Sequence, residues 1–251
     1  MGATITRFGL RKLGGIAAIT TLLSLVGCTY LNNNAPLAPS SDKGHNANNP
    51  SVSSKVMAVQ VCATCHDKHG QAESPIFSRL AGQQKDYIVA QLLDFRDRSR
   101  SDKASIVYMW GMSRNLTDQQ IYELADYFSS QSPMRGQRSN SPLLAMGQKI
   151  FEQGIPGVVQ CNACHGLDGG GTGAIPRIAG QHSEYILRQI IAYQNPGDRE
   201  LMEVGGNTWA PRMQALHRNP ARGGGVMTSM VKNLTLTEAE AVAIYVSTMN
   251  Q

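Results

Sequence analysis

The chain contains the pattern Cys-x-x-Cys-His twice, once in each half, and this pattern limits its fold and chemistry more than any other feature. The first copy is Cys62, Cys65 and His66, and the second is Cys161, Cys164 and His165. Two cysteines one helical turn apart can form thioethers with the two vinyl groups of a haem, while the adjacent imidazole binds its iron. A zinc site would need further ligands at finger-like spacing, and a thioredoxin-type dithiol needs no His after its second Cys. The two copies therefore predict two covalently bound c-type haems.

The residues that follow each copy repeat in the same order, which indicates two homologous domains. The matching segments are Ala81-Gly82-Gln83 with Ala179-Gly180-Gln181, Tyr87 with Tyr185, Gln91 with Gln189, and Met109-x-x-Met112 with Met227-x-x-Met230. We expect the first domain over residues 55–135, a linker over 136–142 and the second domain over 143–251. The second domain is longer and carries an inserted loop at about 196–217.

Hydrophobic periodicity predicts an all-α fold. Apolar residues recur at helical spacing after Tyr87 and after Tyr185. Thr117 and Thr235 each stand three residues before a Gln or a Glu, which is the signature of a capping box at the start of a helix. No strand-like alternation competes with these helices.

Residues 1–28 have the features of a secretion signal. Basic residues precede an uncharged stretch that is too short for a confident membrane span and ends at Leu25-Val26-Gly27-Cys28. This ending resembles a bacterial lipobox, in which Cys28 would receive a lipid anchor. The alternative is an ordinary signal peptide cut near Gly27, which would leave a free thiol.

Residues 29–54 are rich in Asn, Pro, Ala and Ser and predict a flexible tether between the anchor and the folded domains. The chain has a formal net charge of +5. Removing the signal takes away three basic residues and no acidic one, which leaves +2. The remaining charge is a poor argument for nucleic-acid binding, and we expect none.

These motifs together resemble the di-haem class I cytochromes of the cytochrome c4 family, over the whole mature chain. The resemblance implies two tandem monohaem cytochrome c domains related by a pseudo-twofold axis, with haem propionate edges facing across the interface. It also implies that Met109 and Met227 are the second axial ligands, opposite His66 and His165. Met112 and Met230 remain the competing candidates, and they are expected in the core or the haem wall.

The resemblance extends to residues around the two imidazoles. Ile175-Pro176-Arg177 resembles the segment whose Pro carbonyl orients the proximal His, and the first half has Ser78 at the equivalent position. Arg79 and Arg177 are expected either to pair with propionates or to lie in solvent. Of the histidines outside the motifs, His69, His182 and His217 are expected at the surface, and His45 in the tether is expected in solvent.

The expected function is electron transfer on the periplasmic side of a bacterial membrane, with lipid anchoring to the outer membrane. A quinol-oxidising cytochrome complex or a dehydrogenase would donate electrons, a terminal oxidase would accept them, and the protein would be a monomer that docks transiently. The alternatives are a di-haem redox enzyme of the peroxidase or thiosulfate-oxidising type, or a fixed cytochrome subunit of a respiratory complex. An enzyme needs an open iron position and a nearby acid–base group. His and Glu are absent around both candidate Met ligands, so an electron carrier is favoured, with the inserted loop beside Met227 leaving the second domain open.

Overall fold

The computed structural model describes residues 52–100, 102, 105–194 and 224–250. Cys28, the signal segment, the inserted loop with His217, and most of the tether lie outside these residues. In the described part of the chain the secondary structure is helical, apart from two isolated bridges that pair Ile155 with Val158 and Thr172 with Ile175. The prediction of an all-α fold is therefore confirmed. None of the helices in these ranges is long and apolar enough to cross a membrane.

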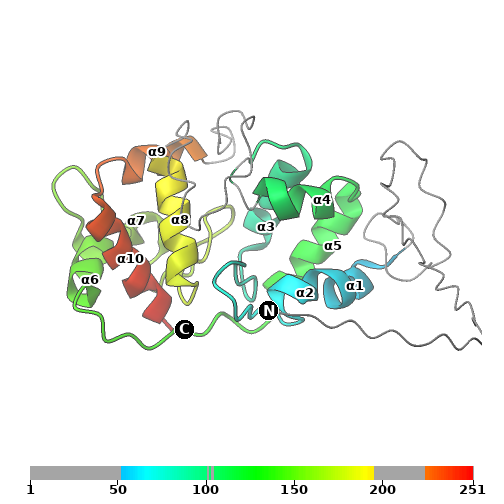
Figure 1. Ribbon diagram of the computed structural model, residues 1–251, viewed down its shortest axis with the longest axis horizontal. Helices are drawn as coiled ribbons and strands as arrows, with labels where there is room; N and C mark the ends of the chain where they lie inside the picture. Colours follow the sequence, from blue (N-terminus) through cyan, green and yellow to red (C-terminus); the bar gives the residue numbers. More distant parts are fainter. Residues whose placement is uncertain (1–51, 101, 103–104, 195–223, 251) are drawn as a thin grey trace, which may run out of the picture. The chain divides into compact units, whose positions relative to one another are not determined.

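The helices form two groups, one in each half of the chain (Figure 1). The first group consists of α1 (Ser54–Met57), the π-helical turn η1 (Ala58–Cys62), α2 (Ala63–His66), α3 (Lys85–Arg96), the π-helical turn η2 (Ser105–Met109), α4 (Trp110–Ser113) and α5 (Asp118–Ser129). The second group consists of α6 (Leu144–Gln153), α7 (Asn162–His165), α8 (Ser183–Gln194), α9 (Gly224–Val231) and α10 (Leu236–Thr248).

The closing helix of each domain begins at a capping box, as the sequence predicts. The Thr117 hydroxyl accepts from the backbone N–H of Gln120, whose side chain accepts from the backbone N–H of Thr117. Thr235 and Glu238 make the same exchange at the start of α10. Each box satisfies two N–H groups that the first turn of a helix would otherwise leave without an acceptor.

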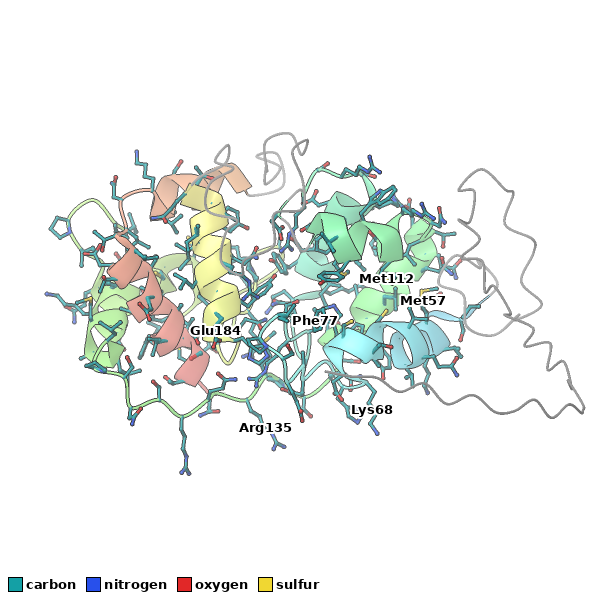
Figure 2. All side chains as sticks on the ribbon, in the orientation of Figure 1. Met57, Lys68, Phe77, Met112, Arg135 and Glu184 are labelled. Carbon is teal, nitrogen blue, oxygen red and sulfur yellow. The ribbon has the colours of Figure 1, made fainter. Side chains whose placement is uncertain are left out.

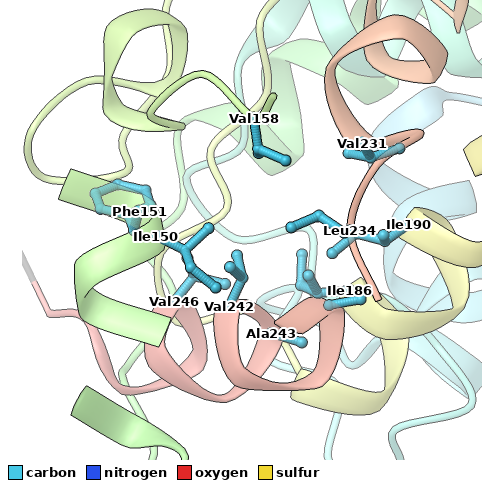
Figure 3. Close-up of a cluster of buried hydrophobic side chains, with 11 residues drawn as sticks. Ile150, Phe151, Val158, Ile186, Ile190, Val231, Leu234, Val242, Ala243 and Val246 are labelled. Carbon is cyan, nitrogen blue, oxygen red and sulfur yellow. The ribbon is translucent and has the colours of Figure 1, made fainter. Parts of the chain in front are cut away.

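The core of the second domain forms where α6, α8 and α10 meet (Figure 3). α10 supplies Val242, Ala243 and Val246, and α8 supplies Ile186 and Ile190. Gly147 lets α6 and α10 approach closely, because a Cβ at this position would lie 2.0 Å from the Ala241 carbonyl oxygen. The first domain builds a comparable cluster around Ile121, Leu124, Ala125 and Phe128 of α5, against Ile88 and Val89 of α3.

Equivalent segments of the two domains contact each other reciprocally. The Gln83 side chain donates to the Arg177 carbonyl oxygen at 2.9 Å and accepts from the Arg177 N–H at 2.7 Å. The Gln181 side chain makes the same two contacts with the backbone of Arg79, both at 2.9 Å. Such exchange between matching positions is what a twofold contact produces. The duplicated Ala-Gly-Gln motif therefore builds the interface between the domains.

The two arginines of this interface also bind across it through their guanidinium groups. Arg79 Nη1 donates to the Gly180 carbonyl oxygen at 2.8 Å, and Arg177 Nε donates to that of Gly82 at 3.2 Å. Arg177 is only 4% exposed. The expectation that these arginines either lie in solvent or pair with propionates did not include this role.

Candidate haem sites

The cysteines and histidine of each Cys-x-x-Cys-His copy lie on one short helical segment. Cys62 ends η1 and Cys65 and His66 belong to α2, so the two thiols are separated by about one turn. In the second domain, Cys161 precedes α7, which carries Cys164 and His165. All four cysteines are free of disulfides. The two domains therefore present the same donor set on the same local backbone.

Each motif histidine is buried and held in one tautomer by a backbone carbonyl group. His66 Nδ1 lies 2.8 Å from the Ser78 carbonyl oxygen, and His165 Nδ1 lies 2.9 Å from that of Pro176. Since a carbonyl oxygen only accepts, Nδ1 carries the proton and Nε2 keeps its lone pair. The sequence correctly anticipated both carbonyl partners.

Burial keeps these imidazoles neutral. It lowers the pKa of His66 and of His165 by disfavouring the charged ring, and the carbonyl hydrogen bonds offset only part of that effect. His66 is 8% exposed and His165 is 6% exposed. A neutral imidazole with a free Nε2 is the form that binds a metal ion.

The first cysteine of each motif is kept as a thiol. Burial raises the pKa of Cys62 and of Cys161 to about 11. Within the described residues no cluster of three or more His, Cys, Asp or Glu side chains could hold a metal ion, as a zinc site would require. Two thiols and one oriented imidazole per domain thus fit a covalently attached haem.

The candidate methionines differ in exposure. Met109 ends η2 and is partly buried. Met112, which is labelled in Figure 2, lies on α4 and is 49% exposed. In the second domain Met227 and Met230 both lie on α9 and are partly buried, and Met227 packs against the core cluster of that domain. Met109 shares a helical group with His66, and Met227 shares one with His165.

His182 is not at the surface, and the prediction for this residue is wrong. It is 2% exposed, its Nε2 lies 2.7 Å from the Ala72 carbonyl oxygen, and its Nδ1 lies 3.1 Å from Gln137 Nε2. The ring therefore joins the second domain to the first domain and to the linker. His69 is exposed as expected.

Sequence reasoning also missed the role of the two interface glutamines. Their signal was present, because Gln83 and Gln181 occupy the same place in the duplicated Ala-Gly-Gln motif. A repeated polar residue at an otherwise apolar turn indicates a repeated contact, but it does not reveal the partner. The structure supplies that partner in the backbone of the opposite domain.

Comparison with known proteins gives a consistent result for both halves of the chain. A family model described as cytochrome c matches residues 53–132 and 144–250. Cytochrome c-552 of Acidithiobacillus ferridurans is 34% identical over 192 residues, which cover 75% of this chain and 73% of that protein. Cytochrome c4 of Pseudomonas aeruginosa is 33% identical and covers 57% of this chain and 73% of its own length.

Two solved structures of cytochrome c4 proteins are similar to this chain in fold as well as in sequence. The cytochrome c4 structure from Acidithiobacillus ferrooxidans superposes with a TM-score of 0.61 at 33% identity, covering 75% of this chain and 98% of that one. Reduced recombinant cytochrome c4 from Pseudomonas stutzeri gives a TM-score of 0.64 at 26% identity, covering 78% of this chain and 97% of that one.

Another relative in sequence is a thiosulfate dehydrogenase electron acceptor from Thiomonas intermedia. It is 32% identical over 53% of this chain and 63% of its own length.

Proposed function

Because the chain belongs to the cytochrome c family, and within it to the di-haem cytochrome c4 group, we propose that it shuttles electrons between protein partners in the periplasm. The donor is a quinol-oxidising cytochrome complex or a dehydrogenase, and the acceptor is a terminal oxidase. One observation carries the proposal: each domain holds a buried imidazole whose Nδ1 donates to a carbonyl oxygen. A carrier with two such sites can accept one electron in each domain.

We assign the haem attachments to the two Cys-x-x-Cys-His copies. The thiols of Cys62 and Cys65 hold one haem, and those of Cys161 and Cys164 hold the other. His66 and His165 would bind the two haem irons through Nε2. Bound iron supplies the one-electron chemistry, and the protein fixes the ring orientation of each imidazole through the carbonyl of residue 78 or 176.

We assign the second axial ligands to Met109 and Met227. The partial burial of Met109 and the exposure of Met112 support the choice in the first domain. In the second domain Met227 and Met230 both lie on α9 and are partly buried, and the choice of Met227 rests on the resemblance to the family. A thioether ligand stabilises the reduced iron and gives the high potential that suits a respiratory carrier.

Absorption spectra of the purified holoprotein and of alanine variants test these assignments. Met109→Ala and Met227→Ala should each remove half of the near-infrared charge-transfer band of oxidised Met-ligated haem and create a site that binds carbon monoxide. The neighbouring variants Met112→Ala and Met230→Ala are matched controls that should retain the full band. A wild-type protein with a high-spin haem, or loss of the band in a control, would overturn the corresponding assignment.

A second candidate has support from one group of relatives, those described as thiosulfate dehydrogenase electron acceptors. Under this candidate the electron donor is a thiosulfate-oxidising dehydrogenase, and this chain remains the carrier. Thiosulfate alone should leave the oxidised protein oxidised, whereas thiosulfate with catalytic amounts of such a dehydrogenase should reduce it. Reduction by thiosulfate alone, or reaction of the second domain with peroxide, would instead favour a di-haem enzyme.

We also propose that the mature protein is lipid-anchored through Cys28 to the outer membrane and that residues 29–54 tether the folded domains to it. The lipobox-like sequence supports this proposal. Mass spectrometry of the purified N-terminus should find a modified cysteine. Cys28→Ala should release the protein from the membrane fraction, and an unmodified wild-type N-terminus in the soluble fraction would contradict the proposal.

A further inference from the structure

Arg100 is a buried cation in the loop that follows α3. It is 5% exposed, and its guanidinium lies 4.6 Å from the centre of the Phe95 ring. Its Nε donates to Asp102 Oδ2 at 2.7 Å and its Nη1 donates to Gln91 Oε1 at 2.8 Å. A buried guanidinium is expensive unless a carboxylate and further acceptors satisfy it. Within the first domain this one has both kinds of partner, which satisfy Nε and Nη1.

The same guanidinium reaches the second domain. Arg100 Nη2 donates to Gln189 Oε1 at 3.0 Å and to the Tyr185 hydroxyl at 3.3 Å, and both residues lie on α8. Gln189 is the counterpart of Gln91 in the internal repeat. The cation therefore sits between two equivalent amides, one from each domain, and connects them through one rigid planar group.

The carboxylate partner continues this chain of contacts toward η2. Asp102 Oδ2, which binds Arg100, also accepts from the Ser105 hydroxyl. Ser105 is 1% exposed and begins η2, and Met109 ends it. Beyond η2, the Ser113 hydroxyl donates to the Met109 carbonyl oxygen at 2.6 Å. The segment that carries Met109 is thus fixed at both ends, and its first end is fixed through Asp102.

We propose that Arg100 is a positioning residue that transmits docking of the second domain to the Met109 segment and thereby tunes the haem of the first domain. Contact with Gln189 and Tyr185 holds the guanidinium, the guanidinium holds Asp102, and Asp102 holds the start of η2. This inference rests on the proposed assignment of Met109 as an axial ligand. It predicts that changes on α8 of one domain alter the iron–methionine bond of the other.

The test uses the reduced holoprotein and the methionine methyl resonances that a haem ring current shifts far upfield. Met109→Ala identifies the resonance of the first domain by its disappearance. In the double variant Gln189→Ala with Tyr185→Phe, the Met109 resonance should move while the Met227 resonance keeps its position. The equilibrium distribution of one electron between the haems should change about tenfold, which corresponds to about 59 mV.

Gln84→Ala is the matched control. Gln84 Nε2 also donates across the interface, to the carbonyl oxygens of Gly170 at 2.9 Å and Gly171 at 3.2 Å, but it does not contact Arg100. This variant should leave the Met109 resonance where it is. An equal shift in the control would mean that any loss of docking has the same effect, and it would overturn the role of Arg100.

A second set of variants distinguishes the effect of the Arg100 side chain's position from the effect of its charge. Arg100→Gln removes the cation, Asp102→Asn removes the anion, and the double variant removes both while breaking the same contacts. A positioning role predicts a displaced Met109 resonance in all three variants. Recovery of the wild-type resonance in the double variant would show a purely electrostatic effect and would overturn positioning.

The outcomes also separate this inference from the function on which it rests. If the wild-type protein shows no methionine resonance that Met109→Ala removes, the ligand assignment fails. If that resonance is present but the α8 variant leaves it unmoved, only the role of Arg100 fails. Far-ultraviolet circular dichroism of each variant establishes that its helices are intact.

Discussion

The side-chain amide of Gln83 pairs with the backbone N–H and carbonyl of Arg177 in the opposite domain, and Gln181 pairs in the same way with Arg79. Both glutamines are buried, at 5% and 2% exposure respectively. In each glutamine, the amide nitrogen donates to the carbonyl oxygen of one residue in the other domain, and the amide oxygen accepts from the N–H of the same residue. These two pairs use only backbone groups of Arg79 and Arg177, whose guanidinium groups bind separately to the carbonyl oxygens of Gly180 and Gly82.

Loss of either glutamine should weaken the contact between the domains by a similar amount. Gln83→Ala leaves the buried N–H and carbonyl group of Arg177 without their partner, and Gln181→Ala does the same to the partly buried groups of Arg79, at a cost of about 1–3 kcal/mol each. Calorimetry of the holoprotein should show a lower unfolding temperature and, in the double variant, separate transitions for the two domains. Gln119→Ala is the control, because Gln119 bonds only to the exposed Glu123 on its own helix. A single unchanged transition in the double variant would argue against this interface.

Gly147 should tolerate no side chain. In Gly147→Ala the new Cβ would lie 2.0 Å from the Ala241 carbonyl oxygen, so α6 and α10 must separate. We expect a loss of about 1–3 kcal/mol in the free energy of unfolding, despite the better helix propensity of alanine. Gly111→Ala is the matched control, since a Cβ there has nothing within 4 Å. Urea unfolding measures the free energy of unfolding of both variants. An equal loss in the two would contradict the close approach of α6 and α10.

His182 should make stability depend on pH. Burial, together with the nearby cations Arg79 and Arg188, lowers the pKa of His182, and the Ala72 carbonyl and Glu184 only partly oppose this effect. Between the lowered pKa of the folded state and about pH 6.5, the unfolded chain binds a proton at this residue that the folded chain does not. The free energy of unfolding should therefore fall with decreasing pH, by up to about 1.4 kcal/mol per pH unit from this residue alone.

Urea titrations between pH 5 and pH 8 check this dependence. His182→Gln should flatten it by the contribution of one group. If His182→Gln keeps the full slope, the dependence arises elsewhere and the prediction for His182 is refuted.

The two capping boxes should contribute equally to the free energy of unfolding. Thr117→Ala and Thr235→Ala each remove the hydroxyl that accepts from the first turn of the closing helix, which should cost about 1 kcal/mol. Thr237→Ala replaces an exposed threonine inside the first turn of α10 and should have little effect. Thermal unfolding compares the three variants, and a cost at Thr237 equal to that at Thr235 would contradict the capping role.

Local patterns in the sequence predicted the helices and the haem motifs correctly because those features depend on residues close together in the chain. A capping box involves positions three apart, and an amphipathic helix shows its buried face every three or four residues. The carbonyl partners of His66 and His165 were anticipated from the resemblance to the cytochrome c4 family, and they lie 12 and 11 residues beyond their histidines. Internal repetition extended these inferences from one domain to the other.

Contacts between residues about a hundred positions apart were decided by the tertiary structure alone. His182 looks like an ordinary surface histidine in the sequence, yet its ring meets the Ala72 carbonyl group, 110 residues away. Arg100 stands in a polar loop with nothing local to indicate burial, and its partners on α8 are 85 and 89 residues away. Such pairs form only when the two domains meet. The sequence by itself therefore specified two haem-binding domains, and only their docking determined which polar side chains are buried between them.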